Sequence, residues 1–116
     1  MTTDKTGAPT SVSAHADKFC IAVDGHPVGL TAFVDRDDQR IFHHTEVDDD
    51  YEGRGLATIL VGEALAATRS AGKRIVPVCA LVASYLDKHH DLDDIVDPVT
   101  DETEAAAKLT VGRQHA

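Results

Sequence analysis

Two glycines, Gly53 and Gly55, precede a long apolar segment in the middle of the chain. The first four N–H groups of a helix have no intrahelical partner, and the helix dipole adds partial positive charge at the same end. Because glycine has no side chain to keep an anion away, backbone N–H groups here can wrap a phosphate, and Arg54 can add a charge-assisted contact. The alternative is that the two glycines only form a tight turn.

The residues before this segment alternate as in a β-strand and include two polar side chains, His44 and Glu46. Residues two apart in a strand point to the same face. We therefore expect His44 and Glu46 on one face together with Phe42, and residues 41, 43, 45 and 47 on the other, unless a bulge changes the alternation. An imidazole and a carboxylate on one face can relay a proton from an incoming amine through water. The alternative is a hydrogen-bonded polar pair at the end of a strand.

Other polar clusters lack the spacing of a metal site. His43 and His44 are expected on opposite faces of a strand, and His89 and His90 are adjacent on a helix, so neither pair can hold one ion. The aspartates at 48–50 and 91–94 do not have the spacing of a calcium loop. We therefore predict no metal. The sequence also lacks the Gly-x-x-x-x-Gly-Lys pattern of a nucleotide-hydrolysing loop.

The overall charge favours some classes of partner over others. Eleven Lys and Arg stand against twenty Asp and Glu, so the net charge is −9. A nucleic-acid partner needs a concentrated basic face, which the sequence does not show, whereas an acidic surface attracts cationic or amine ligands. The sequence has no apolar segment of membrane-spanning length, and its start has no apolar signal region. We therefore expect a cytoplasmic protein that binds neither nucleic acid nor membranes.

Periodicity along the chain predicts one α/β (α+β) domain over residues 17–97. Alternating apolar residues indicate strands at 18–24, 28–34 and 40–47, which short turns join into an antiparallel three-stranded meander. Apolar positions spaced by three and four residues from Leu56 to Ala71 predict a long helix. Residues 74–79 are predicted to be a fourth strand, parallel to the third. Residues 81–89 are predicted to form a closing helix, with a short helical turn within 91–96.

Both ends of the chain are expected to lie outside this domain. Residues 1–16 are rich in Thr, Ser, Ala and Gly without periodicity, which is typical of a flexible leader. In the tail, residues 98–116, Thr100 to Glu104 precede an alanine-rich segment, which is the pattern of a short capped helix. The sequence leaves open whether this tail is ordered.

Four groups of residues occur in a fixed order: His44 to Val47, Tyr51 to Ala57, Val76 to Cys79, and Tyr85 with His89. In this order they resemble the GCN5-related N-acetyltransferase (GNAT) superfamily, and more closely its short single-domain branch, over residues 18–96. The resemblance implies a short GNAT-like fold in which the third and fourth strands splay apart near residues 46–47 and 77–78. It also implies that acetyl-CoA is the co-substrate, with its pantetheine and acetyl groups in that gap.

The resemblance further implies which residues bind acetyl-CoA. The expected set is Val47, Gly53, Arg54, Gly55, Leu56, Ala57 and Val78, with the backbone of residues 53–57 holding the pyrophosphate. Glu52 stands where the superfamily usually has Gln or Arg. That departure removes one expected pyrophosphate contact, for which Arg54 or Arg69 are the candidates to compensate.

Two further residues are assigned catalytic roles by the resemblance. Tyr85 matches the position of a frequent tyrosine acid, which protonates the leaving thiolate; the alternative is a half-buried tyrosine that packs at a sheet edge. Cys79 matches a cysteine common in the short branch, either a covalent acetyl carrier or a thiol lining the thioester pocket. The alternative is a buried, inert residue, which is also our expectation for Cys20. Cys79 and Tyr85 complete the expected catalytic set with His44 and Glu46.

These expectations predict an N-acetyltransferase that moves an acetyl group from acetyl-CoA to an amine-bearing small molecule or protein. The alternative from another class is a non-enzymatic acyl-CoA-binding or protein-interaction module, because the chain is short and lacks the helices that build the acceptor site in longer superfamily members. A third alternative is a purely structural domain with a tight glycine turn. The sequence identifies neither the acceptor nor the oligomeric state.

Overall fold

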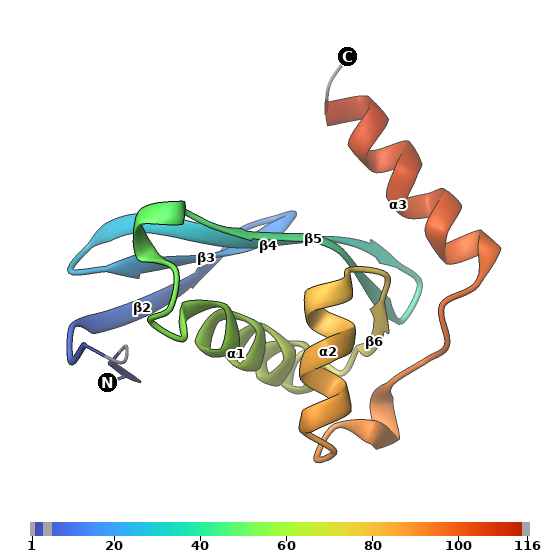
Figure 1. Ribbon diagram of the computed structural model, residues 1–116. Coiled ribbons are helices and arrows are strands. Elements are labelled where there is room, and N and C mark those ends of the chain that lie inside the picture. Colours follow the sequence, from blue (N-terminus) through green and yellow to red (C-terminus); the bar gives the residue numbers. More distant parts are fainter. Residues whose placement is uncertain (1, 4–5, 115–116) are drawn as a thin grey trace.

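The computed structural model describes residues 2–3 and 6–114, which form one curled sheet with helices on both faces (Figure 1). The sheet order is β1-β2-β3-β4-β5-β6, and all neighbours are antiparallel except β5 and β6. The strands are β1 (Thr2–Thr3), β2 (Pro9–Ala14), β3 (Lys18–Val23), β4 (His26–Arg36), β5 (Gln39–Val47) and β6 (Arg74–Pro77). The helices are η1 (Asp49–Tyr51), α1 (Leu56–Ser70), α2 (Ala80–Lys88), η2 (Asp93–Ile95) and α3 (Asp101–Gln114).

The predicted meander is confirmed as β3, β4 and β5. The two-residue turn Asp24-Gly25 joins β3 to β4, and both residues have positive φ, 51° and 81°. This conformation matches the twist of the flanking strands, and glycine and aspartate adopt it more readily than most residues. The turn fixes the pairing of Ala22 and Val23 with Pro27 and His26, and an irregularity between Ile21 and Ala22 then shifts the register. Phe19 and Ile21 of β3 lie on the buried face.

Strand β2 corrects the prediction that residues 1–16 form a leader without structure. Residues 9–14 pair antiparallel with β3, with Thr10 opposite Val23 and Val12 opposite Ile21. Thr10 is buried and Val12 packs against the main core, while the intervening serines are exposed. The free edge of β3 supplies the backbone partners for this pairing. Because such pairing is long-range, the composition of the segment does not reveal it.

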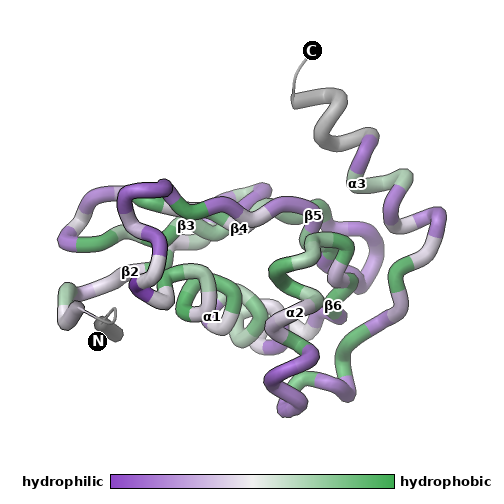
Figure 2. The backbone as a smooth tube through the Cα atoms, in the orientation of Figure 1, coloured by the Kyte–Doolittle hydropathy of each residue, from purple (hydrophilic) through white to green (hydrophobic). Residues whose placement is uncertain are grey.

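Helix α1 covers one face of the sheet and forms the core with it. Its buried positions are Leu56, Leu60, Val61, Ala64, Leu65 and Thr68, and the apolar ones pack against Phe19, Phe33 and Phe42 of the strands. Figure 2 shows the apolar segments concentrated where α1, β6 and α2 meet the sheet. Each large side chain buried in this way contributes about 1.5–3 kcal/mol to the stability of the fold.

The parallel pair of β5 and β6 opens along its length, as the splayed fold requires. Pairing runs from Gln39 opposite Arg74 to Phe42 opposite Pro77, and the Cys79 N–H then donates to the Phe42 carbonyl at 2.7 Å. Pro77 has no N–H to continue the ladder, so the strand ends there rather than at residue 79. In the part of the chain that the structure describes, no strand pairs with the outer edge of residues 43–47.

A bulge in β5 overturns the expected grouping of its side chains. Ala32 of β4 pairs with His44 and Phe33 pairs with Phe42, which leaves His43 as the extra residue. Phe42 therefore packs under α1, where its ring lies 5.7 Å from that of Phe33. His44 and Glu46 face the opposite side of the sheet, so our expectation that Phe42 shares their face was wrong.

The tail is ordered as helix α3, which lies over the sheet face opposite α1 (Figure 1). The predicted cap is present. The Thr103 N–H donates to Thr100 Oγ1 at 3.2 Å, and the Thr100 N–H donates to Thr103 Oγ1 at 2.9 Å. Ala107 packs against Ile41 of β5 and Val76 of β6 in a small second core. The helix therefore belongs to the folded body rather than to a separate tail.

Candidate active site

A cavity of about 600 Å³ lies between the end of β5 and the start of α1, and we call it the loop cavity. It brings together six of the predicted residues: Glu46, Val47, Gly53, Gly55, Leu56 and Ala57. Thr45, Thr58 and Leu81 also line it, although none of the three was predicted. The strand, loop and helix predicted from the sequence thus surround a cavity next to the part of β5 that does not pair with β6.

The N-terminus of α1 is left without a side-chain cap. Gly55 occupies the N-cap position with a left-handed conformation, φ 78° and ψ 15°, and makes no capping hydrogen bond through a side chain. The Ile59 N–H donates to the Gly55 carbonyl at 3.2 Å, which is the first bond of the helix. The N–H groups of residues 56–58 precede this bond at the cavity, together with the positive end of the helix dipole. This end of α1 is suited to bind an anion.

The two arginines expected to help at this site differ in position: Arg54 lies at the rim, over the ring of Tyr51, which lines the loop cavity, whereas Arg69 is distant. The Arg54 guanidinium is 4.7 Å from the centre of the Tyr51 ring, and Arg54 is not among the described residues that line the loop cavity. Arg69 lies near the other end of α1, roughly 20 Å from its start at 1.5 Å per residue, and is ion-paired with Asp94 at 2.5 Å. Arg69 therefore cannot compensate for Glu52, whose carboxylate side chain lines the loop cavity.

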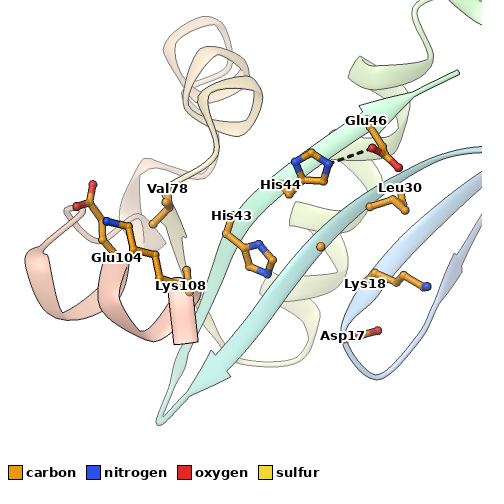
Figure 3. Close-up of a pocket in the computed structure, with 11 residues that line it drawn as sticks. Asp17, Lys18, Leu30, His43, His44, Glu46, Val78, Glu104 and Lys108 are labelled. Carbon is orange, nitrogen blue, oxygen red and sulfur yellow. Dashed lines mark hydrogen bonds and ion pairs between the residues drawn. The ribbon is translucent and has the colours of Figure 1, made fainter. Parts of the chain in front are cut away.

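A second and larger cavity, of about 760 Å³, lies on the opposite face of the sheet beneath α3 (Figure 3). We call it the α3 cavity. Leu30 and Ala32 of β4, Val78 after β6 and Ala107 of α3 give it apolar walls. Glu46 lines both this cavity and the loop cavity, so the two approach each other at the open edge of β5. Val78, predicted beside acetyl-CoA, thus faces the α3 cavity and not the loop cavity.

His44 and Glu46 form the pair that the sequence predicted. His44 Nε2 lies 3.1 Å from Glu46 Oε2, and the two side chains are 57% and 62% exposed. Both line the α3 cavity, and Figure 3 shows them side by side at one end of it. At this exposure a His–Glu pair contributes little to stability. The proton relay that we expect from the two residues stays a prediction.

The bulge residue His43 is a site residue that the sequence reasoning missed. It lines the α3 cavity, and both of its ring nitrogens are buried without a hydrogen-bond partner in the described part of the chain. Burial lowers the pKa of His43 below its ordinary value of 6.5; the neighbouring His44 adds to this effect and Asp17 opposes it. His43 is therefore neutral at pH 7. The signal in the sequence is the doublet His43-His44; regular alternation places the two on opposite faces, and the bulge brings both to the α3 cavity.

Cys79 is buried and does not reach any of the three cavities among the described residues. Its Sγ donates to Thr45 Oγ1 at 3.3 Å, and that hydroxyl lies 2.8 Å from Thr31 Oγ1. Thr45, in turn, lines the loop cavity. A hydroxyl thus stands between the thiol and the cavity, an arrangement typical of a buried cysteine with a satisfied hydrogen bond.

Tyr85 lies apart from the other predicted catalytic residues, in a third cavity of about 160 Å³. Its ring stacks on His89 with centres 4.2 Å apart, and its hydroxyl packs against Gly62 of α1. Burial, with a smaller contribution from Asp91, raises the pKa of Tyr85 above 10.0, so the hydroxyl is protonated at neutral pH. Ala57 and Leu81 line both this cavity and the loop cavity, so Tyr85 borders the predicted acetyl-CoA site from the α2 side.

Two features are absent from residues 2–3 and 6–114. No group of three or more His, Cys, Asp or Glu side chains there is arranged to hold a metal ion. No helix within this part of the chain combines the length and apolar character needed to cross a membrane.

Comparison with known protein families identifies the family of this chain. The sequence matches the family described as GCN5-related N-acetyl-transferase over residues 18–95, which include β3 to η2 and exclude β2 and α3. No curated protein matches the chain.

Proposed function

Since the chain belongs to the GCN5-related N-acetyltransferase family, we propose that it binds acetyl-CoA in the loop cavity and transfers the acetyl group to an amine. Family membership and the fold support acyl transfer in general. The observation that supports acetyl-CoA binding is that the uncapped start of α1 lies beside the unpaired edge of β5. The first feature suits a pyrophosphate, and the second leaves backbone groups to pair with the amides of a pantetheine arm.

The position of Glu46 supports transfer across the sheet. A thioester that enters along residues 45–47 from the loop cavity reaches the gap where β6 leaves β5, and Glu46 faces the α3 cavity on the other side. An acceptor amine in the α3 cavity then meets the acetyl carbon at this gap. Its nitrogen forms the C–N bond as the C–S bond breaks, and CoA leaves as the thiol after taking up a proton.

Neither Cys79 nor Tyr85 is assigned a bond-forming role in this proposal, for different reasons. Because the Cys79 thiol is buried and hydrogen-bonded to Thr45, direct attack by the amine is favoured over an acetyl-cysteine intermediate. The protonated Tyr85 hydroxyl is chemically suited to be an acid, but it packs against Gly62 in a neighbouring cavity. We assign it to the wall of the cofactor site. Intact mass during turnover tests the first point, because the covalent route requires an acetyl adduct on Cys79.

A pair of substitutions at Thr58 tests the acetyl-CoA site. Thr58 is exposed, lines the loop cavity and belongs to the first turn of α1. Thr58→Asp places a negative charge beside the proposed pyrophosphate, while the same charge favours the helix dipole, so the fold is not weakened. Calorimetric titration with acetyl-CoA should show affinity reduced about tenfold or more in Thr58→Asp. Thr58→Asn, which has the same shape without the charge, should bind within about threefold of the wild type.

Thermal unfolding provides the first screen. A ligand at a hundred times its Kd stabilises the folded state by about 2.7 kcal/mol, which corresponds to roughly 10 °C for a chain of this size. No shift with millimolar acetyl-CoA contradicts the proposal. A shift in the absence of thiol release with any amine favours the alternative of a non-enzymatic acyl-CoA-binding module.

A further inference from the structure

The α3 cavity contains an imidazole whose ring nitrogens have no hydrogen-bond partner among the described residues. His43 lies at the β5 bulge, and both of its ring nitrogens are buried without a partner in the described residues. A buried polar group without a hydrogen bond costs about 1–3 kcal/mol, and such a group in a folded protein calls for an explanation. The ring lines a cavity of about 760 Å³, within the range of small-molecule sites, and a turn about its Cβ–Cγ bond would bring a nitrogen that is now buried to a ligand there, which could supply the missing partner.

The walls of the cavity indicate the chemistry of that ligand. Leu30, Ala32, Val78 and Ala107 suit an apolar stem. Three carboxylates and two ammonium groups line the cavity: Asp17 and Lys18 adjoin in sequence, Glu104 and Lys108 project together from α3 (Figure 3), and Glu46 supplies the remaining negative charge. A small amine with an aliphatic stem satisfies both properties, because it is a cation on arrival and apolar behind its nitrogen.

His43 also differs from its neighbour in what it can accept. His44 Nε2 is engaged by Glu46 and the side chain is 57% exposed, whereas the nitrogens of His43 have no such partner in the described chain. A neutral imidazole has one nitrogen that accepts a proton or hydrogen bond. The pKa of His43 is lowered mainly by burial, and the other charged groups around the ring are His44 and Glu46 of β5, Asp17 and Lys18, and Glu104 and Lys108 of α3.

We infer that the α3 cavity is the acceptor site for a small aliphatic amine and that His43 is the catalytic base that receives its proton, an inference that rests on the proposed function. The ring reaches the amine by a turn about its Cβ–Cγ bond. The ammonium gives one proton to His43, and the free amine forms the C–N bond as the C–S bond breaks. The nitrogen then loses a second proton, which the CoA thiolate takes up, and His43 returns its proton to solvent. Helix α3, outside the family match at 18–95, completes this site.

The test uses n-butylamine as the probe amine and follows thiol release from acetyl-CoA between pH 5.5 and 9. His43→Ala should lower kcat/KM for n-butylamine by about 10²-fold or more, with acetyl-CoA affinity unchanged. Added imidazole should restore part of the rate, because it can occupy the space left by the ring; a residue with only a structural role gives no such rescue. His90→Ala, on the exposed surface beside Asp93, should change neither the rate nor its response to imidazole.

A second pair of variants tests the cavity without touching the histidine. Ala32→Leu fills the cavity from β4, and it should raise the KM for n-butylamine about tenfold while leaving the affinity for acetyl-CoA unchanged. Ala22→Leu on β3 is the control, because Ala22 is also half-buried but does not line the α3 cavity.

The outcomes separate the two proposals. Absence of acetyl-CoA binding by the wild type removes the proposed function and this inference with it. Acetyl-CoA binding without acetylation of n-butylamine, or with rates that neither His43→Ala nor Ala32→Leu changes, overturns only the inference.

Discussion

The two faces of the sheet are covered by helices in different ways. Under α1, apolar side chains from the helix and the strands pack together into the main core. Under α3, the described residues form a small apolar cluster around Ile41, Val76 and Ala107 and an ion pair between Arg36 and Glu102, and a cavity with polar side chains lies beside them. The comparison teaches that the α1 face supplies most of the core, whereas the α3 face leaves room for a cavity over the sheet. β5 contributes to both because its bulge changes which side chains point to which face.

The largest expected effect tests the α1 face. Leu60→Ala removes a fully buried side chain and should lower the free energy of unfolding in urea by about 2–5 kcal/mol. Leu81→Ala makes the same chemical change at a residue that is 46% exposed, so it should cost less than about 1 kcal/mol. An equal decrease in the free energy of unfolding in the two variants would contradict the assignment of the main core to this face.

A smaller effect is expected where β4 and β5 approach each other. A Cβ at Gly29 would lie 2.8 Å from the Glu46 carbonyl oxygen, so Gly29→Ala must push the open end of β5 away and should cost about 1–3 kcal/mol. At Gly62 the corresponding contact is the Tyr85 hydroxyl at 2.9 Å, which can swing aside.

Gly62→Ala is therefore the matched control, measured in the same urea titration. Alanine favours a helix over glycine by about 0.5–1 kcal/mol, so Gly62→Ala should be close to neutral. Destabilisation of both variants to the same extent would show that the backbone at Glu46 yields as easily as a side chain.

The loss of folding stability at low pH provides a test of the segment between β6 and α3, which contains Asp97. A hydrogen bond from Gln39 and the charge of Arg74 lower the pKa of Asp97 below 3.8, against an opposing effect of burial. A lowered pKa means that Asp97 stabilises the fold above the unfolded value and that this contribution is lost as the pH falls through the folded value.

Asp97→Asn should therefore destabilise the protein at pH 7 by about 1 kcal/mol, and the difference from the wild type should shrink as the pH approaches 3. Chemical unfolding at several pH values measures it, with Asp87→Asn on the exposed side of α2 as the control. A difference that is constant with pH would contradict a role for the Asp97 charge.

The smallest effect is expected on the α3 face, at His43. Below pH 6.5 the unfolded chain binds a proton at this residue that the folded protein resists, so the wild type loses stability as the pH falls from 7. His43→Leu removes this loss together with the unpartnered nitrogens. We expect its stability to match that of the wild type within about 1 kcal/mol at pH 8 and to exceed it at pH 5.5. A variant that is less stable at both pH values would place His43 with the structural residues.

Much of the fold could be predicted because its signals are local. Alternation in β3 and β4, the turn at Asp24-Gly25 and the apolar stripe of α1 are read from neighbouring residues. Strand β2 was missed because its Ser- and Thr-rich sequence becomes a strand only beside the free edge of β3. The sequence left open whether β5 contains a bulge, because packing of Phe42 against Phe33 decides it and that contact joins two strands.

The candidate site divides along the same line. The loop residues were found because a glycine with positive φ before a helix has a local signature. The position of Arg69 depends on Asp94, which is distant in sequence, so the sequence could not place its side chain at the other end of α1. The Arg54 guanidinium lies on the Tyr51 ring, and its contact with a pyrophosphate stays a prediction. The part of the site under α3 could not be predicted for a similar reason. The sequence predicts the helix and the strands β4 and β5, but not that the helix lies on these strands.

The bare start of α1 has a consequence for how the protein responds to a ligand. Gly55 offers no side chain to the first N–H groups of α1, so an anion that binds there acts as the missing cap. The first helical turn should then become more ordered as more of the protein binds the anion. Amide hydrogen exchange of residues 56–58 should then slow in step with saturation, which makes this turn a built-in reporter of binding.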